Sequence, residues 1–256
     1  MAREVARSKA IVAIDTSVIR DVVERDPSGE RWPELGRCSA RFRFTIFDAN
    51  LLELARQIRD EPAVQQSWFR ERHRLAPPLD AVDPVLSITE SPKWKGTREE
   101  AAQSKTGFVV LFRHLVQKEC PNSLGKSLRK VNLDELLRTS HGHYTDLMRR
   151  MSADIRGGKY GDRKELAEDN RADDHAPIYF KLITARAIEG ARPRGPYNPE
   201  KRPNDSPDTR LVGTLDFAPN ARVITNDRNL IRRVHEVAGE AVDRIHTLSE
   251  FVSGYC

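Results

Sequence analysis

Short apolar runs that end on or near an aspartate recur along the chain. Residues 10–14 (AIVAI) are apolar on both faces, which is typical of a central parallel strand, and Asp15 follows directly. Residues 42–47 (FRFTIF) predict a second strand with an aspartate directly after it. Residues 222–225 (RVIT) predict a third strand, with Asp227 two residues beyond it. This recurrence of strand and acid is the most informative pattern in the sequence.

Each of these strands is followed by a stretch with helical periodicity. Residues 18–24 follow the first strand, Asp48 can cap a leucine-rich helix after the second, and residues 230–237 are amphipathic after the third. Residues 244–248 predict a last short strand, with Ser249 capping a final helix. Strands that alternate with helices favour an α/β fold, here a three-layer α/β/α arrangement around a central parallel sheet. Ligand sites in such sheets lie beyond the carboxyl ends of the strands.

The middle of the chain has a different pattern. Residues 77–78 and Pro84 predict a loop, while the apolar spacing over 98–119 and 132–151 predicts helices. Five prolines between residues 193 and 207 predict an extended connection. We therefore expect one domain over residues 1–256, with its core from 8–60 and 176–252 and a mainly helical insertion over 62–175.

A short helix is predicted after the proline-rich connection, with Ser206 as its N-cap. Asp208 precedes Leu211 and Leu215 by three and seven positions, so it lies on the core-facing side of this helix. Such a carboxylate is either a first-turn acid that complements the helix dipole or one that points into a cleft. Because only a helix and a strand separate it from Asp227, we expect the two acids to lie close together.

Together these pieces resemble the PIN-domain nucleases. The matching segments are the opening strand with its acid (IVAIDTS), the second strand end and helix (FDANLLELA), the helix that begins at an acid (SPDTRLVGTLDFA) and the strand with a Thr-Asn-Asp turn (VITNDRNL). The resemblance covers residues 8–60 and about 204–252. It implies a PIN-like fold and an acidic cluster that binds Mg²⁺ or Mn²⁺ and hydrolyses phosphodiester bonds, usually of RNA. Carried over by position, the catalytic and metal-binding acids are Asp15, Glu53, Asp208 and Asp227, with Thr16, Ser17 and Asn226 as supporting polar residues.

Two members of this cluster have alternatives. Glu53 falls largely opposite the apolar stripe of its helix, as a solvent-facing glutamate would, and Asp48 is its rival as a metal ligand. The segment between the second and third acids is long, which leaves the third acid open. Besides Asp208, the candidates for it are Asp173, Asp174 and Asp205.

The chemistry of such a cluster follows from its charges. Converging carboxylates repel one another and raise one another's pKa values, so a divalent cation stabilises the pocket they form. Mg²⁺ and Mn²⁺ prefer oxygen ligands, and Mg²⁺ keeps several waters. A metal ion can generate the attacking hydroxide and stabilise the leaving 3′ oxygen. The expected reaction is in-line attack by water, which leaves a 5′-phosphate.

Charge and cysteine content change this picture only slightly. Lys and Arg exceed Asp and Glu by 43 to 38, and residues 61–205 supply the excess. Basic clusters at 70–74, 126–130 and 149–150 could follow a phosphate backbone, with Trp68 and Trp94 stacking on bases, although solvated helix faces explain them equally well.

Three scattered cysteines without a Cys-x-x-Cys spacing predict a reduced, cytoplasmic protein with neither a disulfide framework nor a zinc ribbon. The apolar runs are too short to predict a membrane span.

Other catalytic motifs are weak. His141, His143 and the triplet 173–175 lack a second ligand cluster at a zinc spacing, so we expect exposed loop histidines there. Neither a phosphate loop of the Gly-x-x-x-x-Gly-Lys-Ser/Thr type nor a Gly-x-Ser-x-Gly motif is present in the sequence.

The leading hypothesis is a Mg²⁺- or Mn²⁺-dependent endoribonuclease that cleaves single-stranded RNA. The resemblance also implies a possible role as a toxin or defence effector, held by a small antitoxin or by a second copy of the chain. The alternatives are a catalytically silent PIN-like scaffold that binds RNA or a protein partner, and a DNA nuclease with the same acidic site.

Overall fold

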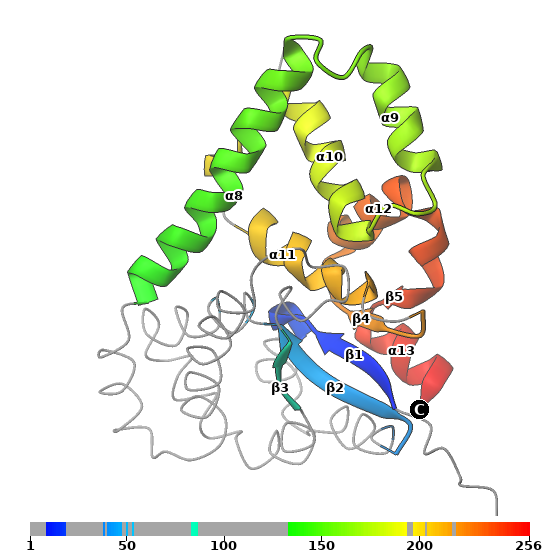
Figure 1. The fold of residues 1–256 in the computed structure, drawn as a ribbon. Coiled ribbons are helices and arrows are strands. Elements are labelled where there is room, and N and C mark those ends of the chain that lie inside the picture. Colours follow the sequence, from blue (N-terminus) through cyan, green and yellow to red (C-terminus); the bar gives the residue numbers. More distant parts are fainter. Residues whose placement is uncertain are drawn as a thin grey trace, which may run out of the picture.

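A parallel sheet forms the centre of the protein in a computed structural model, which describes residues 9–18, 38, 40–47, 50, 53, 83–86, 133–193, 197–202, 204–216 and 219–256. In these parts of the chain the sheet has five strands in the order β3-β2-β1-β4-β5, and all neighbours are parallel (Figure 1). The strands are β1 (Ala10–Ile14), β2 (Phe42–Phe47), β3 (Asp83–Leu86), β4 (Arg222–Ile224) and β5 (Ile245–His246). The predicted α/β fold is confirmed.

The remaining elements are helices. The α-helices are α8 (Leu133–Arg156), α9 (Arg163–Ala172), α10 (Ile178–Gly190), α11 (Asp205–Val212), α12 (Arg228–Val237) and α13 (Leu248–Tyr255). Three short 3₁₀ helices connect them: η3 (Pro199–Lys201), η4 (Gly213–Asp216) and η5 (Gly239–Arg244). None of the helices in the described part of the chain is both long and apolar enough to cross a membrane.

Strand β1 lies in the middle of the sheet because both of its faces are apolar. Val12, Ala13 and Ile14 are fully buried, and β1 pairs with β2 on one side and with β4 on the other. The chain thus builds the sheet outward in one direction through β2 and β3, then returns to add β4 and β5. Parallel sheets form a ligand-binding crevice where the strand order reverses in this way, beyond the carboxyl ends of the two strands. In this protein the crevice lies at the ends of β1 and β4.

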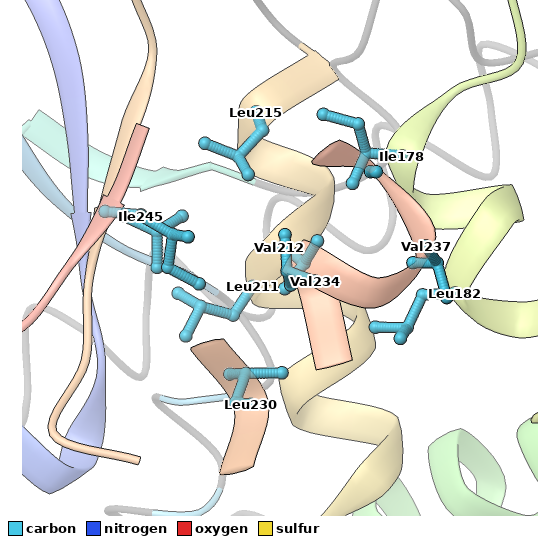
Figure 2. Close-up of a cluster of buried hydrophobic side chains, with 12 residues drawn as sticks. Ile178, Leu182, Leu211, Val212, Leu215, Leu230, Val234, Val237 and Ile245 are labelled. Carbon is cyan, nitrogen blue, oxygen red and sulfur yellow. The ribbon is translucent and has the colours of Figure 1, made fainter. Parts of the chain in front are cut away.

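Helices cover both faces of the sheet. On one face Ala13, Val223 and Ile245 are neighbours in register and carry an apolar cluster with α10, α11, α12 and η4 (Figure 2). The largest members of this cluster from the helices are Ile178, Leu182, Leu211, Val212, Leu215, Leu230, Val234 and Val237. On the other face the ring of Phe251 from α13 packs against Phe44 of β2, with ring centroids 6.2 Å apart. The apolar cluster on the first face fixes the starts of α11 and α12 against the sheet.

A second apolar cluster joins α8 to α10. Met148 and Ile155 of α8 pack there against Ile183 and Ala187 of α10. Ser152 donates a hydrogen bond to the carbonyl oxygen of Ala187 at 3.1 Å, close to Gly190. Helices α8 and α9 lie in the segment predicted as a helical insertion, and most of residues 62–132 lie outside the described residues, including the predicted helix over 98–119. The division into core and insertion stays a prediction.

Three local predictions were wrong. The predicted loop around Pro84 is the edge strand β3, where a proline is tolerated because the edge leaves some backbone groups unpaired. The helix predicted to be capped by Ser206 has Asn204 in the cap position, and Ser206 lies in its first turn. The final helix is capped by Thr247 rather than Ser249, with Glu250 completing a capping box.

A disulfide joins Cys38, shortly before β2, to Cys256 after α13, with Cα atoms 5.2 Å apart. The expectation of a reduced protein without a disulfide was therefore wrong. The two cysteines are 218 positions apart, so only the packing of α13 beside β2 brings them together. Since disulfides are rare in reducing compartments, the cysteine content no longer supports the predicted cytoplasmic location.

Candidate functional site at the ends of β1 and β4

Asp15 is the central acid of the site. It follows β1, its side chain is 5% exposed, and its backbone N–H donates to the carbonyl oxygen of Ile224 at 2.9 Å, which continues the pairing of β1 with β4. Three side chains donate hydrogen bonds to its carboxylate, Ser17 at 2.5 Å, Thr225 at 2.7 Å and Asn50 at 3.0 Å, and the hydroxyl of Thr16 lies 3.3 Å from it. The carboxylate is therefore held in one orientation at the end of the sheet.

Glu53 belongs to the same group of side chains. The hydroxyl of Thr16 lies 2.7 Å from Oε2 of Glu53 and 3.3 Å from Oδ1 of Asp15, so one hydroxyl links the two acids. Asn50 lies one helical turn before Glu53, on the same side of its helix, and contacts Asp15 directly. Glu53 is half-buried and faces the site, rather than solvent. Its predicted rival, Asp48, lies outside the described residues.

Asp227 is placed by the start of α12. Its Oδ1 accepts hydrogen bonds from the backbone N–H groups of Asn229 at 2.8 Å and Leu230 at 3.2 Å, so the carboxylate caps the helix. Its own N–H donates to Oγ1 of Thr225 at 3.0 Å, and the same hydroxyl donates to Asp15. A single threonine thus connects the two acids, which lie close together as predicted.

Asn226 supports the site mainly through its backbone. Its N–H donates to Oγ of Ser17 at 3.1 Å, which fixes the serine that contacts Asp15. Its side-chain oxygen accepts from the N–H of Leu248 at 3.4 Å, at the start of α13. Thr16 and Ser17 both contact Asp15, and their supporting roles stay a prediction.

Asp208 is the candidate third acid of the cluster. It lies in the first turn of α11 and lines a pocket together with Asp227. Burial, and next the negative charge of Asp15, raise the pKa of Asp208 well above its ordinary value. Asp205 and Asp227 act in the same direction, and the Arg186 guanidinium opposes them. The negative charges of Asp15, Asp205 and Asp227 therefore all act on Asp208 at this crevice.

The alternative third acids have other roles. Asp205 is buried and forms ion pairs with Arg186 at 3.3 Å and Arg233 at 3.5 Å. Asp173 accepts hydrogen bonds from two backbone N–H groups in the exposed turn after α9, and Asp174 lies beside it in that turn. Asp205 also lines the pocket of Asp208 and Asp227, but its carboxylate is paired with Arg186 and Arg233.

Arg186 was missed by the sequence analysis. It is 2% exposed and lies on α10, where its guanidinium contacts the hydroxyl of Tyr144 at 3.0 Å, the hydroxyl of Thr209 and the backbone oxygen of Asp205. The burial of a charge is tolerated when it is paired and hydrogen-bonded in this way. These contacts attach the first turn of α11 to α10 and so fix the position of Asp208.

The pocket at the acids has a volume of about 550 Å³. Its acidic side chains are Asp205, Asp208 and Asp227. Five basic side chains line it as well: Arg186, Lys201, Arg202, Arg232 and Arg233. We call it the acidic pocket. In the described part of the chain, no three His, Cys, Asp or Glu side chains converge into a ready-made metal cage. Mg²⁺ commonly binds through one or two carboxylates and retains its waters, so it does not depend on such a cage.

The weaker sequence candidates stay outside this site. His141 and His143 lie on α8 rather than in a loop, with His143 exposed and His141 half-buried, and His175 is exposed in the turn after α9. Trp68, Trp94 and the basic clusters at 70–74 and 126–130 lie outside the described residues. Comparisons of the chain with protein-family models, curated proteins and solved structures gave no match.

Proposed function

We propose that the protein is a metal-dependent phosphodiesterase that cleaves single-stranded RNA in the manner of the PIN-domain nucleases that its motifs resemble. The observation that carries this proposal is the convergence of acids at one crevice. Asp15, Asp208 and Asp227 come from β1, α11 and the start of α12, and Glu53 joins them through Thr16. Such a concentration of negative charge is unfavourable on its own and is stabilised by a cation.

The donor atoms at the crevice suit Mg²⁺ or Mn²⁺. The candidate ligands are the carboxylates of Asp15, Glu53, Asp208 and Asp227, all of them hard oxygen donors without histidine or thiolate. Asn50 is fully buried, and its Oδ1 has no hydrogen-bond partner, so a metal-bound water could supply one. A bound ion would provide Lewis-acid stabilisation of the phosphate and a water of lowered pKa.

The residues of the chain divide the remaining work. Thr225, Ser17 and Asn50 hold the carboxylate of Asp15 in a fixed orientation. Asp208, whose pKa is raised, holds a proton more readily than an ordinary aspartate and would have to lose it in order to bind a cation as a carboxylate. The basic side chains of the acidic pocket can neutralise a phosphodiester that enters beside the acids.

The test is cleavage of a labelled single-stranded RNA in Mg²⁺ or Mn²⁺. We expect Asp15→Asn and Asp227→Asn to abolish cleavage, while Asp146→Asn, on an exposed part of α8, leaves it unchanged. Cleavage at the wild-type rate by both site variants would reject the proposal. The same variants tested on single-stranded DNA distinguish a ribonuclease from a DNA nuclease with the same site.

A second candidate, a catalytically silent scaffold that binds RNA or a protein, is favoured by one observation. Both carboxylate oxygens of Asp15 already accept hydrogen bonds, and no metal cage is preformed in the described part of the chain. Titration calorimetry with Mn²⁺ separates the two functions, since the scaffold predicts no heat of binding. A toxin role predicts growth arrest on expression, relieved by Asp15→Asn.

A further inference from the structure

A second pocket adjoins the acidic pocket and differs from it in charge. It has a volume of about 410 Å³ and lies between α12 and the segment around η3. Lys201, Arg202, Arg232 and Arg233 line both pockets, so the two adjoin, and we call them together the groove. We call the second one the cationic pocket. Neither Asp208 nor Asp227 lines it, and its own acids are Glu189 and Glu236.

The balance of charge in the cationic pocket is positive. Arg192 joins the four shared basic residues, which gives five cations against the two glutamates. Arg232 pairs with Glu236, and Arg233 pairs with Asp205. In the part of the chain that the structure describes, Lys201 and Arg202 have no carboxylate partner, and both are exposed. Their charge is therefore available to an anion in the groove.

The backbone around η3 keeps these two cations at the groove. The backbone N–H of Lys201 donates to the carbonyl oxygen of Asn198 at 3.2 Å, and that of Arg202 donates to the carbonyl oxygen of Pro199 at 3.1 Å. The guanidinium of Arg202 lies over the ring of Tyr197, 5.7 Å from its centroid, and Tyr197 is itself buried in the wall of the pocket. The arginine is thus partly ordered before any ligand arrives, which lowers the entropy lost on binding.

We propose that the cationic pocket binds a backbone phosphate of single-stranded RNA, next to the phosphate that occupies the acidic pocket. This inference rests on the proposed function, because it takes the acidic pocket as the place of cleavage. The guanidinium forks and the lysine ammonium suit phosphate oxygens. The two pockets share four lining residues and so lie side by side, which allows neighbouring phosphates of one strand to occupy both.

The test is the binding of a fluorescein-labelled oligouridine of twelve nucleotides, measured by anisotropy in EDTA so that cleavage cannot interfere. We expect Lys201→Ala/Arg202→Ala to weaken binding about tenfold at low salt and to reduce the slope of log K against log salt by about 0.7, which is the contribution of one phosphate contact on a single strand. Lys9→Ala/Arg41→Ala is a matched control, because it removes the same two residue types. Both of its positions are exposed and directly precede β1 and β2, at the amino ends of these strands, whereas the crevice lies at the carboxyl ends.

Several outcomes would overturn the inference. It fails if the two double variants bind equally well, if the wild-type protein does not bind the oligouridine in EDTA, or if a duplex of the same length binds more tightly than the single strand. Lys201→Gln, an exposed single change, replaces the double variant if circular dichroism shows that the latter is unfolded. A loss of affinity for DNA of the same sequence by the same factor supports a contact to phosphate.

The outcome is separable from that of the proposed function. If Lys201 and Arg202 are needed for binding but no cleavage occurs in Mg²⁺ or Mn²⁺, the cationic pocket stands and the nuclease proposal fails. If cleavage requires Asp15 and Asp227 but is indifferent to Lys201 and Arg202 in both KM and binding, the nuclease stands and the cationic pocket is rejected.

Discussion

The buried carboxyl of Asp208 should make the stability of the fold depend on pH. Its pKa in the folded chain lies well above the ordinary value of 3.8, because of burial and the neighbouring charge of Asp15. Between these two pKa values the folded chain holds a proton that the unfolded chain has lost. Stability therefore falls as the pH rises through this interval, with a slope that approaches about 1.4 kcal/mol per pH unit for one proton.

The Asp208→Asn variant removes this titration. Near pH 4 the variant and the wild type should have similar free energies of unfolding, because the wild-type carboxyl is then neutral in the folded chain. As the pH rises, the free energy of unfolding of the variant should increase relative to that of the wild type by up to about 1.4 kcal/mol for each pH unit. This increase ends where the pH passes the pKa of Asp208 in the folded chain. Urea unfolding at intervals of half a pH unit, followed by circular dichroism, measures the difference.

The control for this experiment is Asp146→Asn, whose exposed carboxyl lies on α8. Its stability should follow that of the wild type in parallel at every pH. The reasoning is refuted if Asp208→Asn also runs parallel to the wild type, since the carboxyl would then have the same pKa in the folded and unfolded chains.

Mn²⁺ extends the same experiment to the proposed metal site. A ligand that binds only the folded chain stabilises it by about 2.7 kcal/mol at a hundred times its Kd. If Asp208 is a metal ligand, this gain should be present in the wild type at pH 7 and much smaller in Asp208→Asn. An equal gain in both proteins would show that the ion binds elsewhere.

Two further predictions concern the packing around the site. Cys256→Ser opens a covalent loop of 218 positions and should lower the free energy of unfolding by about 5 kcal/mol in the chain-entropy treatment. Urea unfolding without reductant measures this loss, and a loss below about 1 kcal/mol would contradict the prediction. Gly190→Ala places a Cβ only 2.4 Å from Oγ of Ser152, so it should cost about 1–3 kcal/mol. Adding Ser152→Ala to Gly190→Ala should recover part of that loss, and strict additivity in the double-mutant cycle would exclude a clash between these residues.

Strands with strong local patterns were predictable from the sequence, and those with weak patterns were not. β1 and β2 occupy the predicted residues 10–14 and 42–47, because a short apolar run and an alternating aromatic pattern both indicate strands. β3 is only four residues long and contains Pro84, so its local signal indicated a loop. Its membership of the sheet depends on pairing with β2, which a single sequence does not display.

Some missed features had a signal that could have been found. Thr247 and Glu250 have the Thr-x-x-Glu spacing of a capping box, which is a stronger signal than a serine at position 249. Asn50 lies three residues before Glu53, and that spacing places the two side chains on one side of a helix. Both features depend only on spacing along the chain, so the sequence alone was enough to predict them.

The remaining features depend on contacts between distant segments. The pair of Arg186 and Asp205 requires α10 to pack beside α11, and the pair of Cys38 and Cys256 requires α13 to pack beside β2. Asp15, Asp208 and Asp227 could be named because each follows a strand or begins a helix, and Glu53 because of the family resemblance, but their mutual contacts could not be predicted. The prediction of a reduced protein failed for this reason, since cysteine spacing along the chain says nothing about their separation in space.

The hydrogen bond from Thr225 to Asp15 spans 210 positions of sequence. A nascent chain that has emerged only as far as α10 already possesses β1, yet it lacks Asp208, Thr225 and Asp227. Such a chain has neither the neighbouring strand that places Asp15 nor the carboxyls opposite it. The crevice is therefore complete only after β4 and α12 have joined the sheet.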